Sequence, residues 1–305
     1  DACEMLESPA PGSPLEWKKL LRQYGVDILL APGMNIQRNP LNGRNFEYYS
    51  EDPLLTGKIG AAMVNGVESN GVGTTIKHYF GNNSETNRNQ INDIGEPRTF
   101  REIYLRGFQI AVDEAQPWAV MTSYNKVNGT YVNERKDAVT DLLRGEWKFD
   151  GLVMSDWFAG DVANNAYKQV LAGQDLIEPG NVKEQLQQSI EHGDLDEAKV
   201  NEAAVHILTQ MMKSPSYNQL AVSNSPDLAA HATLARQAGG HAERGVIAEA
   251  VFAVLRRLEG HFTLVFAHAD DPGTSGVEFL DAEQIYTHLR ACTDAGVQAG
   301  FHVIG

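Results

Sequence analysis

Short apolar runs alternate with stretches of helical periodicity over the first two-thirds of the chain. The strand-like runs are 25–32, 73–79, 118–125, 151–157 and 175–180. Each is followed by a polar loop or by a helix-like stretch such as 99–115, where apolar residues recur at helical spacing. Continuous apolar runs are typical of parallel strands that helices cover on both faces. The pattern therefore predicts an α/β fold with a parallel sheet.

Polar residues stand at the carboxyl ends of these predicted strands, where the sequence reads KHY, SYN, SDW and EPG. A β/α barrel carries its chemistry on that face, and an open doubly wound sheet also binds ligands there. Both architectures agree with the pattern. We expect a TIM-type (β/α)8 barrel, because the polar ends recur strand after strand. No GxGxxG or GxxxxGK[ST] motif follows a strand, so the usual nucleotide-binding loops are not indicated.

Composition and charge restrict the partners. The chain has 305 residues with 25 basic and 40 acidic side chains, a net charge of −15 that repels phosphate backbones and argues against nucleic acid. No apolar stretch approaches the roughly 20 residues of a membrane helix, and no charged-then-apolar leader opens the sequence. Cysteine occurs only at positions 3 and 292, too few for a disulfide framework or a thiolate metal site. We expect a neutral substrate, no cofactor and no membrane partner.

The residues at the strand ends have the composition of a sugar site. They are Arg44, Glu47, Lys77, His78, Ser123, Tyr124, Asn125, Asp156 and Trp157. Sugars need directional hydrogen bonds at their hydroxyls and an apolar face for stacking. A carboxylate also suits glycosidic cleavage, which passes through an oxocarbenium-like transition state. We expect Arg44 and Lys77 to lower the pKa of Asp156 and keep it ionised.

Each of these residues also has a structural interpretation. Asp156 alone could be a helix N-cap or a turn residue, and Lys77 with His78 could be a solvated charge beside a core histidine. We expect Glu47 to pair with Arg44 rather than to touch substrate. The aromatic residues of the first loop could line an outer sugar subsite or pack beneath the loop; they are Phe46, Tyr48 and Tyr49.

Five long motifs resemble a known family. They read GVDILLAPGMNIQRNPLNGRNFEYYSEDP, GVGTTIKHYFGNNSETNR, AVMTSYNKVNG, LRGEWKFDGLVMSDWF and LAGQDLIEPG. In this order they resemble the catalytic domain of glycoside hydrolase family 3, especially its β-glucosidases, over about residues 24–239. The resemblance implies a TIM-type barrel and a retaining, exo-acting β-glycosidase. Such an enzyme hydrolyses terminal β-D-glucosyl residues of a glucoside or oligosaccharide through a covalent glycosyl-aspartate.

The resemblance also implies roles for single residues. Asp156 matches the nucleophile, and the residues that match those holding or walling the sugar are Arg44, Lys77, His78, Met121, Tyr124 and Trp157. The N-acetylglucosaminidase branch is disfavoured, because its KHFPGHGD-type loop is KHYFGNNSETNR here. Relatives are often secreted or periplasmic, whereas this sequence shows no leader, so the compartment stays undecided.

The sequence departs from the family at both ends. Residues 1–23 form an atypical segment without the family's SDGPSG-like stretch and its sugar-gripping aspartate. The family's acid/base glutamate commonly lies beyond the matched region, so the acid/base is unassigned. From about Gly240 a divergent α/β tail, 240–305, could complete the barrel; it faintly resembles a piece of a metal-dependent amidohydrolase, in which His302 matches a metal ligand. The HxH pair of such a site is absent from the sequence.

Two alternatives to an active glycosidase therefore stay open. One is an incomplete or chimeric barrel with weak or no catalysis, and the weaker one is a metal-dependent amidohydrolase. No compact ligand motif fits the spacing of the histidines at 231, 241, 261, 268 and 302, so we expect no metal site. The acidic residues at 191, 194, 196 and 197 are typical of a solvated helix start rather than a calcium loop.

Overall fold

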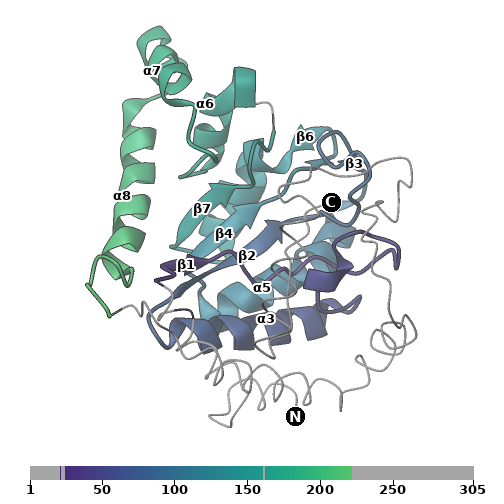
Figure 1. The fold of residues 1–305 in the computed structure, drawn as a ribbon. Coiled ribbons are helices and arrows are strands. Elements are labelled where there is room, and N and C mark those ends of the chain that lie inside the picture. The colour runs from purple at the N-terminus through teal and green to yellow at the C-terminus, as the bar shows by residue number, and fades with distance from the viewer. Residues whose placement is uncertain (1–20, 22–24, 161, 222–305) are drawn as a thin grey trace, which may run out of the picture.

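A parallel sheet with helices packed along it forms the centre of the computed structural model, which describes residues 21, 25–160 and 162–221 (Figure 1). The strands lie in the order β1 (Ile28–Leu29), β2 (Gly73–Tyr79), β4 (Ala119–Thr122) and β7 (Leu152–Ser155), each parallel to the next. A single parallel bridge from Met154 to Leu176 continues the sheet beyond β7. All carboxyl ends of the strands therefore meet at one edge.

The helices follow the strands in alternation. They are η1 (Asn45–Glu47), α3 (Pro53–Glu68), α4 (Pro97–Thr99), the π-helix η2 (Phe100–Tyr104), α5 (Arg106–Ala115), η3 (Val132–Glu134), the π-helix η4 (Asp137–Glu146), α6 (Val162–Ala172), α7 (Lys183–His192) and α8 (Glu197–Lys213). A small second sheet joins β3 (Asn92–Asp93), β5 (Lys126–Val127) and β6 (Thr130–Tyr131). In Figure 1, α3 and α5 lie below the parallel sheet, and α6, α7 and α8 lie on its β7 side.

Local chemistry explains how α3 begins and how it packs. Asp52 is its N-cap and accepts hydrogen bonds from the amides of Leu54 and Leu55, while Pro53 supplies the preset first turn. A Cβ on Gly57 would lie 2.7 Å from the Cβ of Ile110, so glycine lets α3 approach α5 closely. The two helices then cover one face of the sheet.

The core lies between these helices and the strands. Its fully buried side chains include Val64, Ile76, Phe108, Val120 and Val153. Every residue of β2, β4 and β7 is buried, as expected for parallel strands covered on both faces. The predicted α/β class with a parallel sheet is confirmed.

The structure differs from the sequence prediction in three elements. The run 25–32 forms only the two-residue strand β1. The run 175–180 contributes only the bridge at Leu176, because the Val153 amide donates its hydrogen bond to the Asp175 side chain, at 2.7 Å, instead of to a backbone carbonyl. The expected helix 99–115 is divided because the Leu105 amide bonds the Phe100 carbonyl, five residues back, which widens the turn. The stretch 137–146 is also π-wound.

The described strands make an open sheet, so the closed eight-stranded barrel stays a prediction. The predicted N-terminal segment 1–23 falls almost wholly outside the described residues, and so does the tail 240–305 with the elements expected in it. The domain boundaries therefore stay predictions too. In the described part of the chain, no helix has the length and apolar character to traverse a membrane.

Candidate active site

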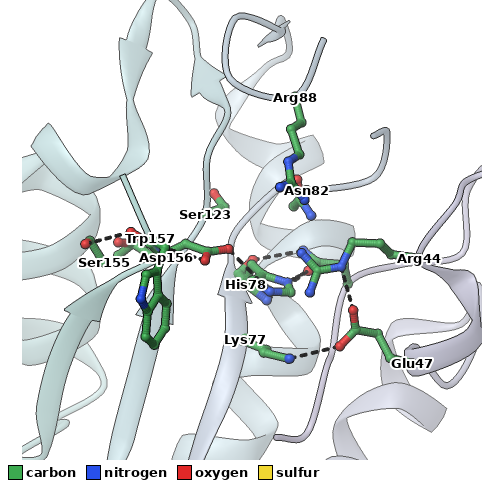
Figure 2. A network of polar contacts seen from close by, with 12 residues as sticks. Arg44, Glu47, Lys77, His78, Asn82, Arg88, Ser123, Ser155, Asp156 and Trp157 are labelled. Atoms are coloured by element: carbon green, nitrogen blue, oxygen red, sulfur yellow. Dashed lines mark hydrogen bonds and ion pairs between the residues drawn. The ribbon is translucent and has the colours of Figure 1, made fainter. Parts of the chain in front are cut away.

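The carboxyl edge of the sheet brings the predicted site residues together. Asp156 directly follows β7, Lys77 and His78 are the two residues before the last residue of β2, Tyr124 follows β4, and Arg44 precedes η1. Figure 2 shows the side chains of Arg44, Lys77 and His78 on one side of Asp156 and Trp157 on the other. Residues distant in the sequence thus converge on one carboxylate.

A register shift in β2 accompanies the placement of His78. Lys77 pairs with Met121 and Tyr79 pairs with Thr122, so His78 is one extra residue in its strand. Such bulges redirect side chains next to functional sites. The Nε2 atom of His78 lies 3.6 Å from Oδ2 of Asp156, and both side chains are buried.

The other side of the His78 residue is held by buried polar groups. The Tyr48 hydroxyl lies 3.1 Å from Nδ1, and the Asn35 amide bonds both the N–H and the C=O of the His78 backbone at 2.9 Å. Tyr48 is itself 5% exposed. Its position supports the packing interpretation over an outer sugar subsite, whereas Phe46, at 59% exposure, lies on the surface.

Glu47 bridges the two cations of the site. Its Oε1 lies 2.5 Å from Nε of Arg44, and its Oε2 lies 3.0 Å from Nζ of Lys77. Burial alone would raise the pKa of Glu47, but the two cations reverse this effect and hold it below its usual range. The predicted pairing of Glu47 with Arg44 is confirmed, and Lys77 shares the same carboxylate.

The expected lowering of the Asp156 pKa is wrong in its net direction. Burial raises the pKa of this carboxyl, and Arg44, the Trp157 amide and Tyr124 offset only part of that effect. Lys77 directs its charge to Glu47 instead. The Trp157 amide donates to Oδ1 at 2.7 Å, while Oδ2 is buried without a hydrogen-bond donor in range among the described residues. Of the two oxygens of this carboxylate, Oδ2 is therefore the one without a donor in hydrogen-bond range in the described part of the chain.

Trp157 and Met121 occupy different environments at this edge. Trp157 is 37% exposed, and Figure 2 shows its indole beside Asp156. Met121 is 2% exposed in β4, with Lys77 and Met154 as its neighbours on the adjacent strands. Its role as a wall of the sugar site stays a prediction.

The side chains of Ser123 and Asn125 form hydrogen bonds with the backbone. Both donate hydrogen bonds to the Phe80 carbonyl, at 2.9 and 3.3 Å respectively, and so fix the end of β2 against the segment after β4. Ser155 donates to the Asp156 carbonyl at 2.8 Å and accepts from the Glu178 amide at 2.9 Å. These serines hold the chain around the candidate site.

Sequence reasoning missed several supporting residues. They are Asn35, Asn82, Glu85 and Arg88, together with the hydrogen-bonding role of Tyr48. Three of them lie in GNNSETNR, a stretch that reads as an ordinary polar loop. The only available signal was the density of amide and charged groups next to KHY.

The described residues contain no group of three or more histidine, cysteine, aspartate or glutamate side chains that could hold a metal ion. The five histidines weighed as ligands lie outside those residues. The acidic run before α8 is exposed, and Asp196 caps the helix by accepting from the Ala198 amide. Asp194, Asp196 and Glu197 thus form a solvated helix start, as predicted, whereas Glu191 lies near the C-terminal end of α7.

Residues 16–210 match the model of the Glycosyl hydrolase family 3 N terminal domain, a range that contains every site residue described above. The chain belongs to glycosyl hydrolase family 3. The resemblance carried by the five motifs is thereby confirmed. In this family the N-terminal domain supplies the α/β fold seen here.

Two relatives of this family 3 chain are named β-glucosidases. It is 38% identical over 274 residues to thermostable beta-glucosidase B of Acetivibrio thermocellus, covering 87% of this chain and 35% of that protein. Beta-glucosidase 3B from Thermotoga neapolitana, solved in complex with glucose, matches with a TM-score of 0.71 and 46% identity over 78% of this chain and 34% of its own.

A third relative carries a different name. Exo-alpha-(1->6)-L-arabinopyranosidase of Bifidobacterium longum is 37% identical over 244 residues, covering 75% of this chain and 32% of that protein. The chain thus spans about a third of the length of each of these three proteins.

Proposed function

We propose that this protein is a retaining, exo-acting β-glycosidase that hydrolyses terminal β-D-glucosyl residues, with Asp156 as the nucleophile. The observation that carries the proposal is Oδ2 of Asp156, a buried carboxylate oxygen at the carboxyl edge of the sheet that lacks a close donor among the described residues. An electrophilic sugar carbon would satisfy that atom. The names of the β-glucosidase relatives support this choice of substrate.

The first step would form a bond between a carboxylate oxygen of Asp156 and the anomeric carbon of the sugar. The bond from that carbon to the aglycone oxygen breaks, and its electron pair leaves with the oxygen, which takes a proton from a general acid. That acid has no candidate among the matched positions. Water then attacks the anomeric carbon, loses a proton to the conjugate base of the acid, and releases Asp156 as a carboxylate.

The neighbouring groups fit sugar binding. The Arg44 and Lys77 cations, already partly neutralised by Glu47, can donate to ring hydroxyls without presenting a large net charge to a neutral substrate. His78 can donate from Nε2 to a hydroxyl that lies over Asp156. Trp157 offers an exposed indole face for stacking against the apolar side of the ring.

A second candidate substrate is an α-L-arabinopyranoside, as the name of the Bifidobacterium longum relative suggests. This pentose lacks the hydroxymethyl group of glucose. A panel of aryl glycosides that contains both sugars separates the two substrates by kcat/KM.

An activated 2-deoxy-2-fluoroglucoside with a dinitrophenyl leaving group tests the nucleophile. A good leaving group needs little protonation, so this reagent reports on Asp156 even where the general acid is missing. We expect one sugar per chain, found on the peptide that contains Asp156 by mass spectrometry. A label on another carboxylate overturns the assignment, and complete absence of label supports the incomplete barrel.

A further inference from the structure

The loop that follows β2 contributes three polar side chains to which the reaction as proposed assigns no role, and two of them are buried. Asn82 is 1% exposed and Glu85 is 4% exposed, while the Arg88 side chain is 20% exposed. Burying a carboxylate costs free energy unless its partners compensate. The loop begins at Gly81, where φ is +90° and a Cβ would lie 2.9 Å from the Asn125 amide nitrogen. The path of this loop is therefore closely fixed.

One oxygen of Glu85 supports the tyrosine beside the nucleophile. Oε2 of Glu85 lies 2.9 Å from Nη1 of Arg88. The Arg88 guanidinium lies over the Tyr124 ring, with its central carbon 4.4 Å from the ring centroid, which is a cation–π arrangement. Arg88 and Tyr124 both lower the pKa of Asp156 against the dominant effect of its burial.

The other oxygen of Glu85 supports the histidine beside the nucleophile. Oε1 accepts one N–H of the Asn82 amide at 3.1 Å, and the same amide nitrogen lies 3.2 Å from the Tyr48 hydroxyl, to which it donates. The Tyr48 hydroxyl lies 3.1 Å from Nδ1 of His78. Glu85 is thus connected to both neighbours of Asp156.

This order of donors favours one tautomer of His78. Nδ1 has a second neighbour, Oδ1 of Asn35 at 3.4 Å, but that oxygen already accepts from the His78 backbone N–H at 2.9 Å. Because the Tyr48 oxygen accepts from Asn82, its own proton is available for Nδ1 of His78. The neutral imidazole then carries its proton on Nε2, which faces Asp156 at 3.6 Å. In that tautomer His78 can donate toward the nucleophile or a sugar hydroxyl.

We propose that Glu85 is a positioning residue for the glycosylation step: one carboxylate oxygen places Arg88 on Tyr124, and the other fixes the Nε2–H tautomer of His78 through Asn82 and Tyr48. The proposal rests on the function proposed above for Asp156. It gives Glu85 a role in the reaction in addition to stabilising the loop after β2.

The variant Glu85→Gln separates this role from a structural one. If the oxygen of the introduced amide keeps the bond to Asn82, its NH₂ group faces Arg88 and releases it from Tyr124. If the introduced amide turns over, its NH₂ group faces Asn82, whose own amide must turn and present its oxygen to Tyr48. The Tyr48 proton then goes to Asn82, and His78 loses its Nδ1 donor. One of the two supports must fail in either orientation.

The first measurement is the ¹⁵N NMR spectrum of histidine-labelled protein without any substrate. The chain has 9 histidines, so His78 is assigned by the signals lost in His78→Asn. We expect wild type to show His78 protonated at Nε2, and Asn82→Ala to shift it toward the Nδ1–H form. An unchanged tautomer in Asn82→Ala overturns the histidine half of the proposal, whether or not the chain is a glycosidase.

The second measurement is the rate of fluoroglucoside labelling of Asp156 against pH. The groups that face this carboxyl come from separate elements: Arg44 before η1, His78 in β2, Arg88 in the loop and Tyr124 after β4. We expect Arg88→Met to move the acidic limb of the profile upward by about 0.5 pH unit or more, and Arg88→Lys to restore most of it. A profile that does not move in Arg88→Met overturns the tyrosine half.

Matched controls come from an exposed ion pair in α4 and η2. Arg98 and Glu102 lie 2.8 Å apart with side chains 83% and 60% exposed. Arg98→Met and Glu102→Gln repeat the same changes in charge and should move neither the tautomer nor the labelling profile. Glu85→Gln should keep a cooperative thermal transition while at least one readout moves; if neither moves, Glu85 serves the loop alone.

Discussion

Nε2 of His78 lies 3.6 Å from Oδ2 of Asp156, with both side chains withdrawn from solvent. The distance is longer than a normal hydrogen bond, so the imidazole faces the carboxylate without fully satisfying it. Burial raises the pKa of Asp156, and a neutral carboxyl cannot attack a sugar. Burial thus works against the ionised form of Asp156, and nearby cations, Arg44 first among them, partly offset this effect.

Replacing Asp156 by asparagine should separate activity from stability. Loss of the attacking carboxylate should reduce turnover of an aryl β-glucoside by about 10⁴-fold or more, the scale of nucleophile deletions in other hydrolases. The same change removes a carboxylate whose ionised form is disfavoured by burial, as its raised pKa indicates. The melting temperature at neutral pH should therefore stay equal or increase. Parallel rate and thermal unfolding measurements check this. Activity above about one per cent of wild type would contradict the assignment.

Arg44 is the strongest of the groups that lower the pKa of Asp156. Arg44→Met should therefore shift the acidic limb of the labelling profile to higher pH, because the ionised form loses its main support. The variant also leaves Glu47 with Lys77 as its partner at 3.0 Å, so the loss of stability should stay below the roughly 3–5 kcal/mol typical of a fully broken buried pair. Urea unfolding at neutral pH measures that loss.

A matched comparison distinguishes the two cations. Lys77→Met removes the other partner of Glu47, but Lys77 is not among the groups that shift the pKa of Asp156, so the pH profile of this variant should stay close to wild type. An equal shift of the acidic limb in both variants would show that the pKa of Asp156 depends on the total charge near Glu47 and not on the position of Arg44.

The strands and their polar ends were predictable because both are local features of the chain. Continuous apolar runs specified the buried strands, and KHY, SYN and SDW stand at or just beyond their carboxyl ends. The partners of these residues were not predictable in the same way. Asn35 bonds the backbone of His78 across 43 positions, and no periodicity connects them.

Burial of polar groups was the main quantity missing from the sequence. The loop GNNSETNR reads as solvated, yet Asn82 and Glu85 are buried in the fold. The pKa of Asp156 was mispredicted for the same reason, since counting nearby cations omits the loss of hydration. The π-turn at 100–104 also escaped, because one extra residue in a turn does not disturb the apolar pattern enough to be seen.

Glu68 should make stability depend on pH near neutrality. Burial raises its pKa from the usual 4.5 to about 7, although the Thr74 hydroxyl and the amides of Thr74 and Trp118 all donate to its Oε1. The folded state then binds a proton that the unfolded state has lost between these pH values. This contribution is complete below about pH 4.5 and disappears as the pH rises through about 7.

Denaturant unfolding of wild type and Glu68→Gln at about pH 5 and about pH 8 measures this effect. Glutamine keeps the oxygen that accepts the three hydrogen bonds and cannot ionise. We expect the variant to lose on the order of 1–3 kcal/mol less than wild type between the two pH values. Identical losses would show that the Glu68 carboxyl does not titrate in this range.

Asp175 should be the most destabilising carboxylate to remove on the β7 side of the sheet. Its oxygens lie 2.5 Å from Arg144 of η4 and 2.7 Å from Nδ1 of His206 in α8, and accept the Val153 amide at 2.7 Å. Asp175→Ala leaves the cation and the amide without this partner, so we expect a loss of about 3–5 kcal/mol by urea unfolding. The exposed pair of Lys58 with Glu114 is the control, and Glu114→Ala should cost less than about 1 kcal/mol. Similar losses in the two variants would contradict a structural role for the Asp175 cluster.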